Sequence, residues 1–236
     1  MRLTILSLLI FIFITSCGKN APRVLIFSKT AGYRHKCIEP AKLAIMNLGA
    51  QHNFEVDTTE DASWFKEENL KKYKAVIFLC TTQDVLNNDQ QAVFERFIKA
   101  GGGYVGIHAA ADTEYEWPWY GKLVGAWFKN HPKIQEATMK KQGSLGNDSL
   151  PDVWTRTDEW YNYLGFSDDI QVLYTLDESS YEGGGNGDYH PIAWYHDFEG
   201  GRSFYTGMGH TNESYSDPLF MEHLLKGIQY AIGKGK

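Results

Sequence analysis

The sequence has few cysteines and prolines, only three and seven among 236 residues. Cys17 lies near the N-terminus, which leaves Cys37 and Cys80, and no spacing typical of a disulfide scaffold or a zinc knuckle is present. Basic residues are in the minority, with 23 Lys and Arg against 29 Asp and Glu, and the net charge is −6. A nucleic-acid-binding protein normally carries a basic patch, so we expect no nucleic acid as a partner.

Two common enzyme motifs are also missing. The dinucleotide-binding motif Gly-x-Gly-x-x-Gly does not follow the first predicted strand, where Gly32 stands alone, so no nucleotide cofactor is expected. A flavin is not expected either, because Ser28–Tyr33 resembles a flavodoxin-like phosphate loop only weakly. The Gly-x-Ser-x-Gly motif of serine hydrolases is absent, and its place at the end of a buried strand is taken by Gly-Ile-His-Ala-Ala at 106–110. This turn offers no Ser or Cys nucleophile, so acyl-enzyme chemistry is not expected.

The N-terminus carries a hydrophobic run of the length found in export signals. Arg2 is followed by an apolar segment from Leu3 to Ile14. The segment ends Ile-Thr-Ser-Cys at 14–17, which resembles a bacterial lipobox. We therefore expect a lipoprotein signal peptide over 1–16, lipidation of Cys17 and a tether over 17–22, with an ordinary signal peptide as the alternative. This predicts a protein of the bacterial cell envelope that faces the periplasm and contacts the membrane only through its lipid anchor.

Hydrophobic patterning predicts a single α/β domain over residues 23–234. Short apolar strands alternate with amphipathic helices in the first half, with strands at 23–28, 54–58, 74–80 and 104–107 and the main helices at 38–50 and 88–100. This is the βαβ pattern of a doubly wound, flavodoxin-like and mostly parallel sheet with helices on both faces. Cys37 and Cys80 should then lie on one rim, with Cα atoms within about 15 Å, because they flank neighbouring strands.

The second half is richer in predicted strands and in aromatic loops. It contains a long aromatic insertion at 109–133 with a helix over 119–128, strands at 133–139 and 170–176, a glycine-rich loop at 179–189 and a closing helix at 217–232. Two β-rich runs, 192–195 and 202–206, flank Gly200-Gly201 and predict an added hairpin with His190 and His210 at its outer ends. The two imidazoles are therefore expected to converge on one rim.

Ligands of open α/β sheets bind outside the carboxyl ends of the strands. Four polar segments occupy such positions in the predicted fold: 28–35, 80–83, 108–112 and the loop 179–190 with its hairpin. Ser and Thr at strand ends can also cap the next helix, which is the structural alternative. The loops are rich in Trp and Tyr, whose flat faces suit sugar rings, although such rings also pack long loops onto a protein body.

A series of segments spans nearly all of the mature chain, at 32–35, 101–112, 125–128, 131–132, 158–161, 190–194 and 209–210. In these segments the chain resembles the ThuA-like (trehalose utilisation) family, which has a class I glutamine-amidotransferase-like fold. The resemblance implies a role in disaccharide breakdown through 3-keto sugars made by a partner sugar dehydrogenase. The family pattern usually carries a further His-Pro between His131 and Asp158, which this chain lacks. His108 and Ala109 stand where amidotransferases carry a nucleophilic cysteine, so no glutaminase activity is expected.

Histidines and one carboxylate at the predicted strand ends are the candidate catalytic residues: His108, His210 and Glu159. Both types of side chain transfer protons. The same three residues are candidate ligands of a divalent metal such as Zn²⁺. The candidate substrate-binding residues are Tyr33, Arg34, His35, Asp112, Trp119, Tyr181 and His190. Asp112 has a helix cap as its structural alternative, His131-Pro132 is interpreted as structural, and no role is assigned to His52 or His223.

The predicted function is that of an enzyme of carbohydrate catabolism acting on a small sugar, in particular a keto-sugar or keto-disaccharide. A base would remove the proton next to the ketone, and a metal ion would be one means of holding the resulting enolate. Lyase, isomerase and hydrolase outcomes share these parts. The alternative is a non-catalytic periplasmic sugar-binding lipoprotein, which needs aromatic loops but no titratable group poised near neutral pH.

Overall fold

The computed structural model describes residues 21–147 and 149–234. The predicted signal peptide and Cys17 lie outside these residues. In the described part of the chain, no helix is long and apolar enough to cross a membrane.

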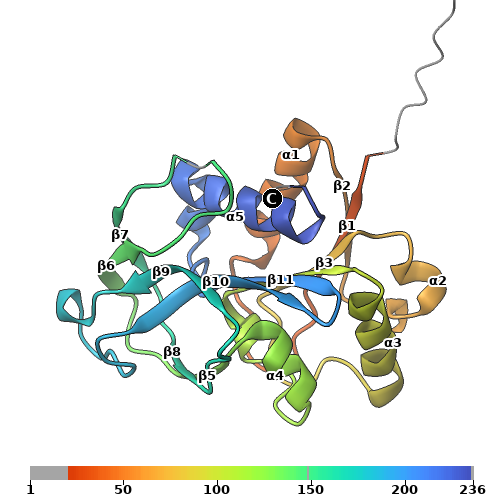
Figure 1. Ribbon diagram of the computed structural model, residues 1–236, viewed down its shortest axis with the longest axis horizontal. Coiled ribbons are helices and arrows are strands. Elements are labelled where there is room, and N and C mark those ends of the chain that lie inside the picture. The colour runs from red at the N-terminus through yellow and green to blue at the C-terminus, as the bar shows by residue number, and fades with distance from the viewer. Residues whose placement is uncertain (1–20, 148, 235–236) are drawn as a thin grey trace, which may run out of the picture.

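The protein has a mixed α/β fold with a largely parallel central sheet, as the sequence predicts (Figure 1). The strand order of the main sheet is β2-β1-β3-β4-β11-β10-β9-β6-β7. The parallel part comprises β2 (Glu55–Thr59), β1 (Arg23–Phe27), β3 (Ala75–Leu79), β4 (Gly103–Ile107) and β11 (Gly201–Thr206). The antiparallel part comprises β10 (His190–Phe198), β9 (Gln171–Leu176), β6 (Gln135–Lys141) and β7 (Val153–Asp158). A separate pair joins β5 (Trp127–Asn130) and β8 (Asn162–Leu164).

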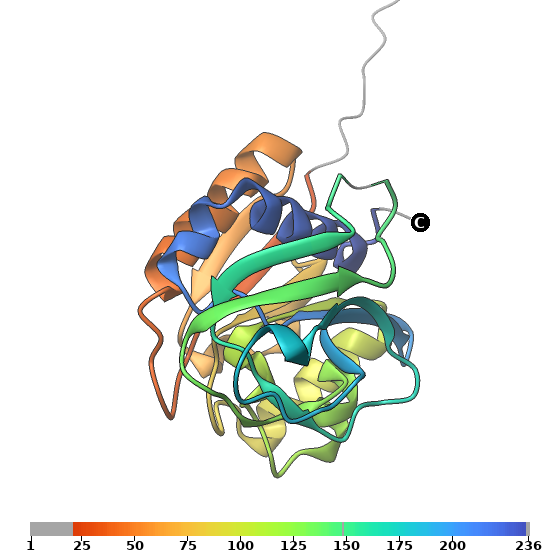
Figure 2. The same cartoon turned by 90° about the vertical axis from the view of Figure 1, so that its left-hand side faces the viewer.

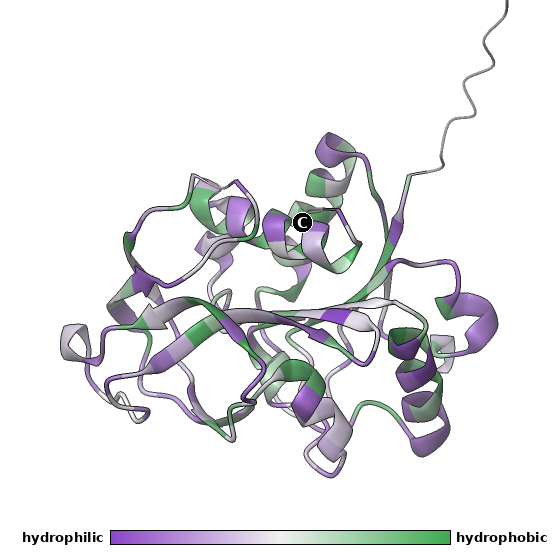
Figure 3. Cartoon of the chain, in the orientation of Figure 1, coloured by the Kyte–Doolittle hydropathy of each residue, from purple (hydrophilic) through white to green (hydrophobic). Residues whose placement is uncertain are grey.

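Helices lie on both faces of the sheet. In Figure 1, α1 (Ile38–His52) and α5 (Pro218–Ala231) lie on one face, and α3 (Asn88–Lys99) and α4 (Pro118–Val124) on the other, while α2 (Glu67–Leu70) is one short turn beside them. Every residue of β3 and β4 is buried, because both faces of these strands are covered. Figure 3 shows hydrophilic and hydrophobic segments alternating along α3, whose buried residues are Phe94 and Ile98. Asn87 and Gln90 form a capping box at its start.

The structure corrects three sequence predictions. The hairpin is not an addition, because β11 pairs with β4 in the middle of the main sheet. The helix predicted over 119–128 ends at Val124, where Gly125 adopts a φ of 100°, and Trp127 begins β5. Strands β7 and β8 were not predicted. Every second residue of β7 is buried, but two of the three buried residues, Arg156 and Asp158, are charged, so the sequence lacks the hydrophobic alternation of a half-buried strand.

The antiparallel part of the sheet curls back toward the parallel part. Four strand spacings, about 19 Å in a flat sheet, separate β11 from β7 in the strand order. Nevertheless Asp158, at the end of β7, accepts hydrogen bonds from the backbone of Gly209 and His210, just beyond β11. Figure 2 faces the edge of the sheet at which β6 and β7 lie. The curl brings the end of this edge strand to the centre of the molecule.

The two cysteines meet at one rim of the sheet, as expected. Cys37 precedes α1 and Cys80 follows β3, and β1 and β3 are neighbours. Both are buried free thiols, and their Sγ atoms are 3.6 Å apart.

Candidate functional site

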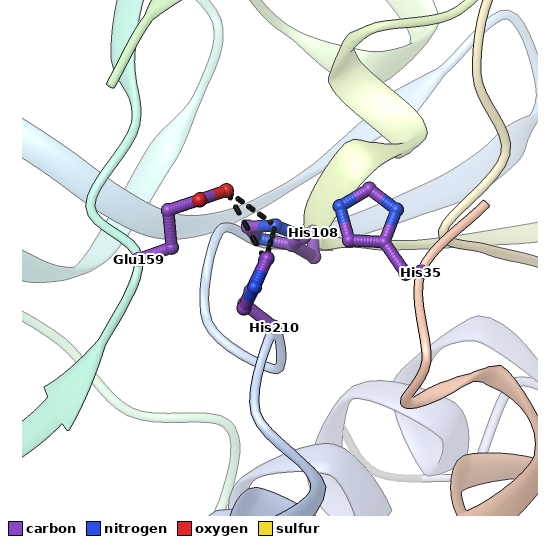
Figure 4. A group of neighbouring side chains, drawn as sticks. All are labelled: His35, His108, Glu159 and His210. Carbon is purple, nitrogen blue, oxygen red and sulfur yellow. Dashed lines mark hydrogen bonds and ion pairs between the residues drawn. The ribbon is translucent and has the colours of Figure 1, made fainter. Parts of the chain in front are cut away.

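Four titratable side chains meet at the carboxyl edge of the sheet: His35, His108, Glu159 and His210 (Figure 4). They follow β1, β4, β7 and β11, respectively. From β11 to β7 the strands reverse direction four times, so β7 runs the same way as β4 and β11. All four strands therefore end at one edge, and one ligand atom from each residue lies within 4.8 Å of the others.

His108 occupies a sharp turn directly after β4. Its φ is 51°, in the left-handed region, which costs a non-glycine residue about 1–2 kcal/mol. The side chain is fully buried, and the Tyr205 hydroxyl donates to the His108 carbonyl over 2.7 Å. Strained residues of this kind concentrate at functional sites. The strand-to-helix turn that carries a nucleophile in many hydrolases thus presents an imidazole here.

The rings of His108 and His210 face the Glu159 carboxylate. His108 Nε2 lies 3.3 Å from Glu159 Oε2 and 3.1 Å from His210 Nδ1. His210 Nδ1 lies 3.1 Å from the same Glu159 oxygen. These three atoms form a nearly equilateral triangle. The structure therefore brings together the three residues predicted to be catalytic.

A second carboxylate, Asp158, holds this arrangement in place. It is fully buried and accepts hydrogen bonds from the backbone amides of Gly209 (2.9 Å), His210 (3.0 Å) and Glu159 (3.0 Å). Its negative charge is paired with Arg156 Nη2 at 3.2 Å. Gly209 has a φ of 103°, and this turn allows consecutive amides to point at one carboxylate. Sequence reasoning did not find Asp158, because its role depends on the curl of the sheet.

The electrostatics favour an ionised Glu159 and a neutral His35. Burial by itself raises the pKa of Glu159, but hydrogen bonds and charge interactions with His108 and His210 outweigh it, and the pKa lies well below its usual value. His35 behaves in the opposite way. Burial, together with the neighbouring His108 and His210, lowers its pKa to about 3, so the ring is neutral at physiological pH.

His131 also reaches this cluster, although the sequence was interpreted as giving it a structural role. Its Nδ1 atom lies 3.2 Å from Glu159 Oε1 and 2.8 Å from the carbonyl oxygen of Pro132. The side chain is 40% exposed and stacks on Tyr161, whose ring also contacts His108 at a centroid distance of 4.2 Å. In the sequence, His131 stood out only as part of the segment 131–132 of the family resemblance, and nothing near it indicated a contact with Glu159. It reaches Glu159 because β5 pairs with β8, which follows Glu159 closely in the chain.

Two of the predicted substrate-binding residues border the cluster, and a third lies beside one of them without reaching it. Tyr33 is 63% exposed, and its ring meets the edge of His35 at 4.9 Å. Asp112, at the end of the turn that begins with His108, accepts a hydrogen bond from the Tyr115 hydroxyl at 2.7 Å, and burial raises the pKa of its carboxyl. Arg34 instead forms ion pairs with Glu39 and Glu60 on the surface.

The structure does not bring Trp119, Tyr181 or His190 into the cluster. Trp119 donates to Glu199 in the β10–β11 turn, at the opposite end of these strands. The His190 ring is fully buried, with Nε2 at 2.8 Å from the Tyr161 carbonyl and Nδ1 at 3.2 Å from the Tyr181 hydroxyl. The antiparallel pairing of β10 and β11 places His190 at the same edge of the sheet as His210, as expected. Both nitrogen atoms of His190 are nevertheless bonded to residues outside the cluster.

The fold and site together define an α/β protein with an imidazole–carboxylate centre at the carboxyl edge of its sheet. The model of the family described as trehalose utilisation, ThuA, matches residues 23–231, so the chain belongs to the ThuA family. This membership suggests a role in trehalose or carbohydrate utilisation. A search among curated proteins found no match to the chain.

Solved structures with the same fold include two proteins described as ThuA-like. The one from Bacteroides uniformis is 25% identical, with a TM-score of 0.78 over 92% of this chain and 95% of that one. The one from Parabacteroides merdae is 20% identical, with a TM-score of 0.75 over 92% of each chain. A β-galactosidase from Bacillus circulans is 13% identical with a TM-score of 0.58, over 90% of this chain and 30% of that one, and shares the fold alone.

Proposed function

We propose that this protein is an enzyme of carbohydrate utilisation that acts on a small keto-sugar or keto-disaccharide by acid–base chemistry. One observation carries the proposal. The Glu159 carboxylate is contacted by three imidazoles, with His108 and His210 at Oε2 and His131 at Oε1. A carboxylate–imidazole group of this kind can remove the proton from the carbon next to a ketone and return it elsewhere. Isomerisation and elimination both begin with this step, and elimination followed by addition of water amounts to hydrolysis.

Two exposed residues next to the cluster, His131 and Tyr33, are suited to meet the substrate. His131 points Nδ1 at two acceptors, Glu159 Oε1 and the Pro132 carbonyl, so Nδ1 carries the hydrogen and Nε2 is left with a lone pair. This is the arrangement of a histidine base oriented by a carboxylate. The exposed ring of Tyr33 beside His35 offers an apolar face for a sugar.

The cellular setting belongs to the same proposal and is supported by the N-terminal sequence. We place the enzyme at the periplasmic face of the cell envelope, anchored through Cys17. The ketone would be supplied by a partner sugar dehydrogenase. A sugar-binding lipoprotein without catalysis needs no buried carboxylate held among imidazoles, so the alternative does not account for the cluster.

Proton exchange at carbon tests the proposal directly. The pure protein is incubated in D₂O with a 3-keto-disaccharide and with the unoxidised disaccharide, and NMR follows the hydrogen next to the ketone. We expect exchange with the ketone only. Glu159→Gln, His108→Ala and His210→Ala should each slow it by about 100-fold or more, while His52→Ala, an exposed position on α1, should leave it unchanged.

Two results would overturn the proposal. An unchanged rate of exchange in Glu159→Gln would show that the carboxylate takes no part in the reaction. Binding of the sugar without exchange in the native protein would favour the non-catalytic alternative. Thermal melts of each variant show whether a loss of activity follows a loss of fold.

A further inference from the structure

The tautomer of His108 is fixed by its surroundings. Nδ1 lies 2.9 Å from the Gly207 carbonyl oxygen, which can only accept a hydrogen bond, so Nδ1 carries the hydrogen. Unless Nε2 also carries a hydrogen, it presents its lone pair to Glu159 Oε2 at 3.3 Å, an oxygen that is itself an acceptor. Along this edge of the triangle two electron pairs, one on His108 Nε2 and one on Glu159 Oε2, then face each other. This contact is favourable only when a cation or a shared proton lies between the two atoms.

We propose that this triangle is one face of a binding site for a divalent first-row transition-metal ion, with His108 Nε2, His210 Nδ1 and Glu159 Oε2 as ligands and His35 as the fourth. A tetrahedral ion with bonds of about 2.0–2.1 Å separates its ligand atoms by about 3.3–3.4 Å. The three edges measured here are 3.1, 3.1 and 3.3 Å. Imidazole and carboxylate together suit Zn²⁺ and its neighbours in the series.

His35 provides an independent observation. Its side chain is buried, with only 5% of the residue exposed, and its Nδ1 atom has no hydrogen-bond partner. Leaving a buried polar atom unpaired is costly, and such atoms are rare in native proteins. The ring sits edge-on to both His108 and His210, at centroid distances of 5.0 and 5.1 Å, on the side away from Glu159 in the view of Figure 4. A bound metal ion would give this imidazole the partner that it lacks among the described residues.

The groups behind the ligands match those of metal sites. The Gly207 carbonyl orients the His108 ring, and Asp158 holds the backbones of Glu159 and His210. Three neutral imidazoles and one carboxylate leave a divalent ion with a net positive charge. In the reaction we propose, the ketone oxygen would enter as a fifth ligand, which Zn²⁺ accepts, and the ion would polarise it. His131, outside the ligand set, would remain for proton transfer. Only this use of the metal rests on the proposed function.

Metal binding is tested without any assay of turnover. The full-length chain, purified with an affinity tag that contains no histidine, is stripped with a chelator and titrated with Zn²⁺ by calorimetry. Metal content is then measured after gel filtration. We expect one equivalent of Zn²⁺ bound with a Kd on the order of 1 µM or tighter. Co²⁺ at the same site should give the visible absorption of a nitrogen- and oxygen-ligated ion.

Variants identify the site. Glu159→Gln, His210→Asn and His35→Asn should each weaken Zn²⁺ binding by about 100-fold or more, and His52→Asn should not. If one ligand variant unfolds without metal, the rise in Tm on adding Zn²⁺ can still be compared between the native protein and the other ligand variants, and a smaller rise in those variants identifies the site. Failure to bind any of Zn²⁺, Co²⁺, Ni²⁺ or Mn²⁺, or equal binding by native protein and Glu159→Gln, would overturn the proposal. Metal binding without proton exchange would support the metal site and contradict the proposed reaction.

Discussion

Replacing Asp158 with asparagine should destabilise the protein strongly, because one buried charge serves several partners. Asp158 Oδ2 accepts from the Gly209 amide at 2.9 Å and faces Arg156 Nη2 at 3.2 Å, while Oδ1 accepts from the Glu159 and His210 amides at 3.0 Å. An asparagine side chain has one oxygen and one NH₂ group. Whichever way it turns, its NH₂ group faces N–H donors.

The structure sets the size of the effect. Asp158 is fully buried, and the Arg156 side chain is only 7% exposed. Removing one partner from such a pair costs about 3–5 kcal/mol of unfolding free energy. Arg156 retains the Ser214 hydroxyl at 2.6 Å and Asp217 at 3.4 Å. We therefore expect a loss near the lower end of the range, about 3 kcal/mol.

Urea unfolding followed by tryptophan fluorescence measures this loss, with a chelator present so that bound metal does not contribute. Glu67→Gln is the matched control, since Glu67 pairs with Arg96 at 2.7 Å but both side chains are more than half exposed. Exposed pairs contribute about 0–1 kcal/mol. A loss for Asp158→Asn that is no larger than the loss for Glu67→Gln would refute the reasoning.

Acid should destabilise the protein in part through His223, whose pKa is lowered to about 3 by burial and by the nearby Arg156. Below about pH 6.5 the unfolded chain binds a proton at His223 that the folded chain does not. Between pH 7.5 and 5.0 the native protein should therefore lose about 2 kcal/mol more unfolding free energy than His223→Leu. Equal losses for the two proteins in urea titrations would contradict this. Gly209→Ala should cost about 1–3 kcal/mol, because φ is 103° and the new Cβ would lie 2.9 Å from the Tyr215 hydroxyl. Gly146→Ala, with φ of 65° and nothing within 4 Å, should cost about 1 kcal/mol, and indistinguishable melting temperatures for the two variants would rule out a role for the contact.

Local patterns were enough to predict strands β1 to β4 of the parallel part of the sheet and the place of His108. Strand β4 is a short apolar run after a glycine-rich helix end, and His108 is the first residue beyond it. Because the carboxyl end of a parallel strand is where ligands bind, the residue type and its position pointed to the same conclusion. Glu159 and His210 were found in a similar way, from chemistry-bearing residues in probable loops.

The remainder of the site depends on contacts between segments far apart in the sequence. His131 touches Glu159 only because β5 pairs with β8, and Asp158 touches His210 only because the sheet curls. Trp119 was expected in the site, but its helix places the ring at the other end of the hairpin, against Glu199. Neither hydrophobic period nor residue type encodes these relations.

The cluster also has a consequence for how the chain folds. Its members come from the ends of β1, β4, β7 and β11, and therefore from nearly the whole length of the domain. Contacts between residues so distant in sequence form late, after the costly closure of long loops. A chain that lacks β11, or has not yet curled β7 into place, has only part of the cluster. The four side chains therefore come together only when the entire domain has folded.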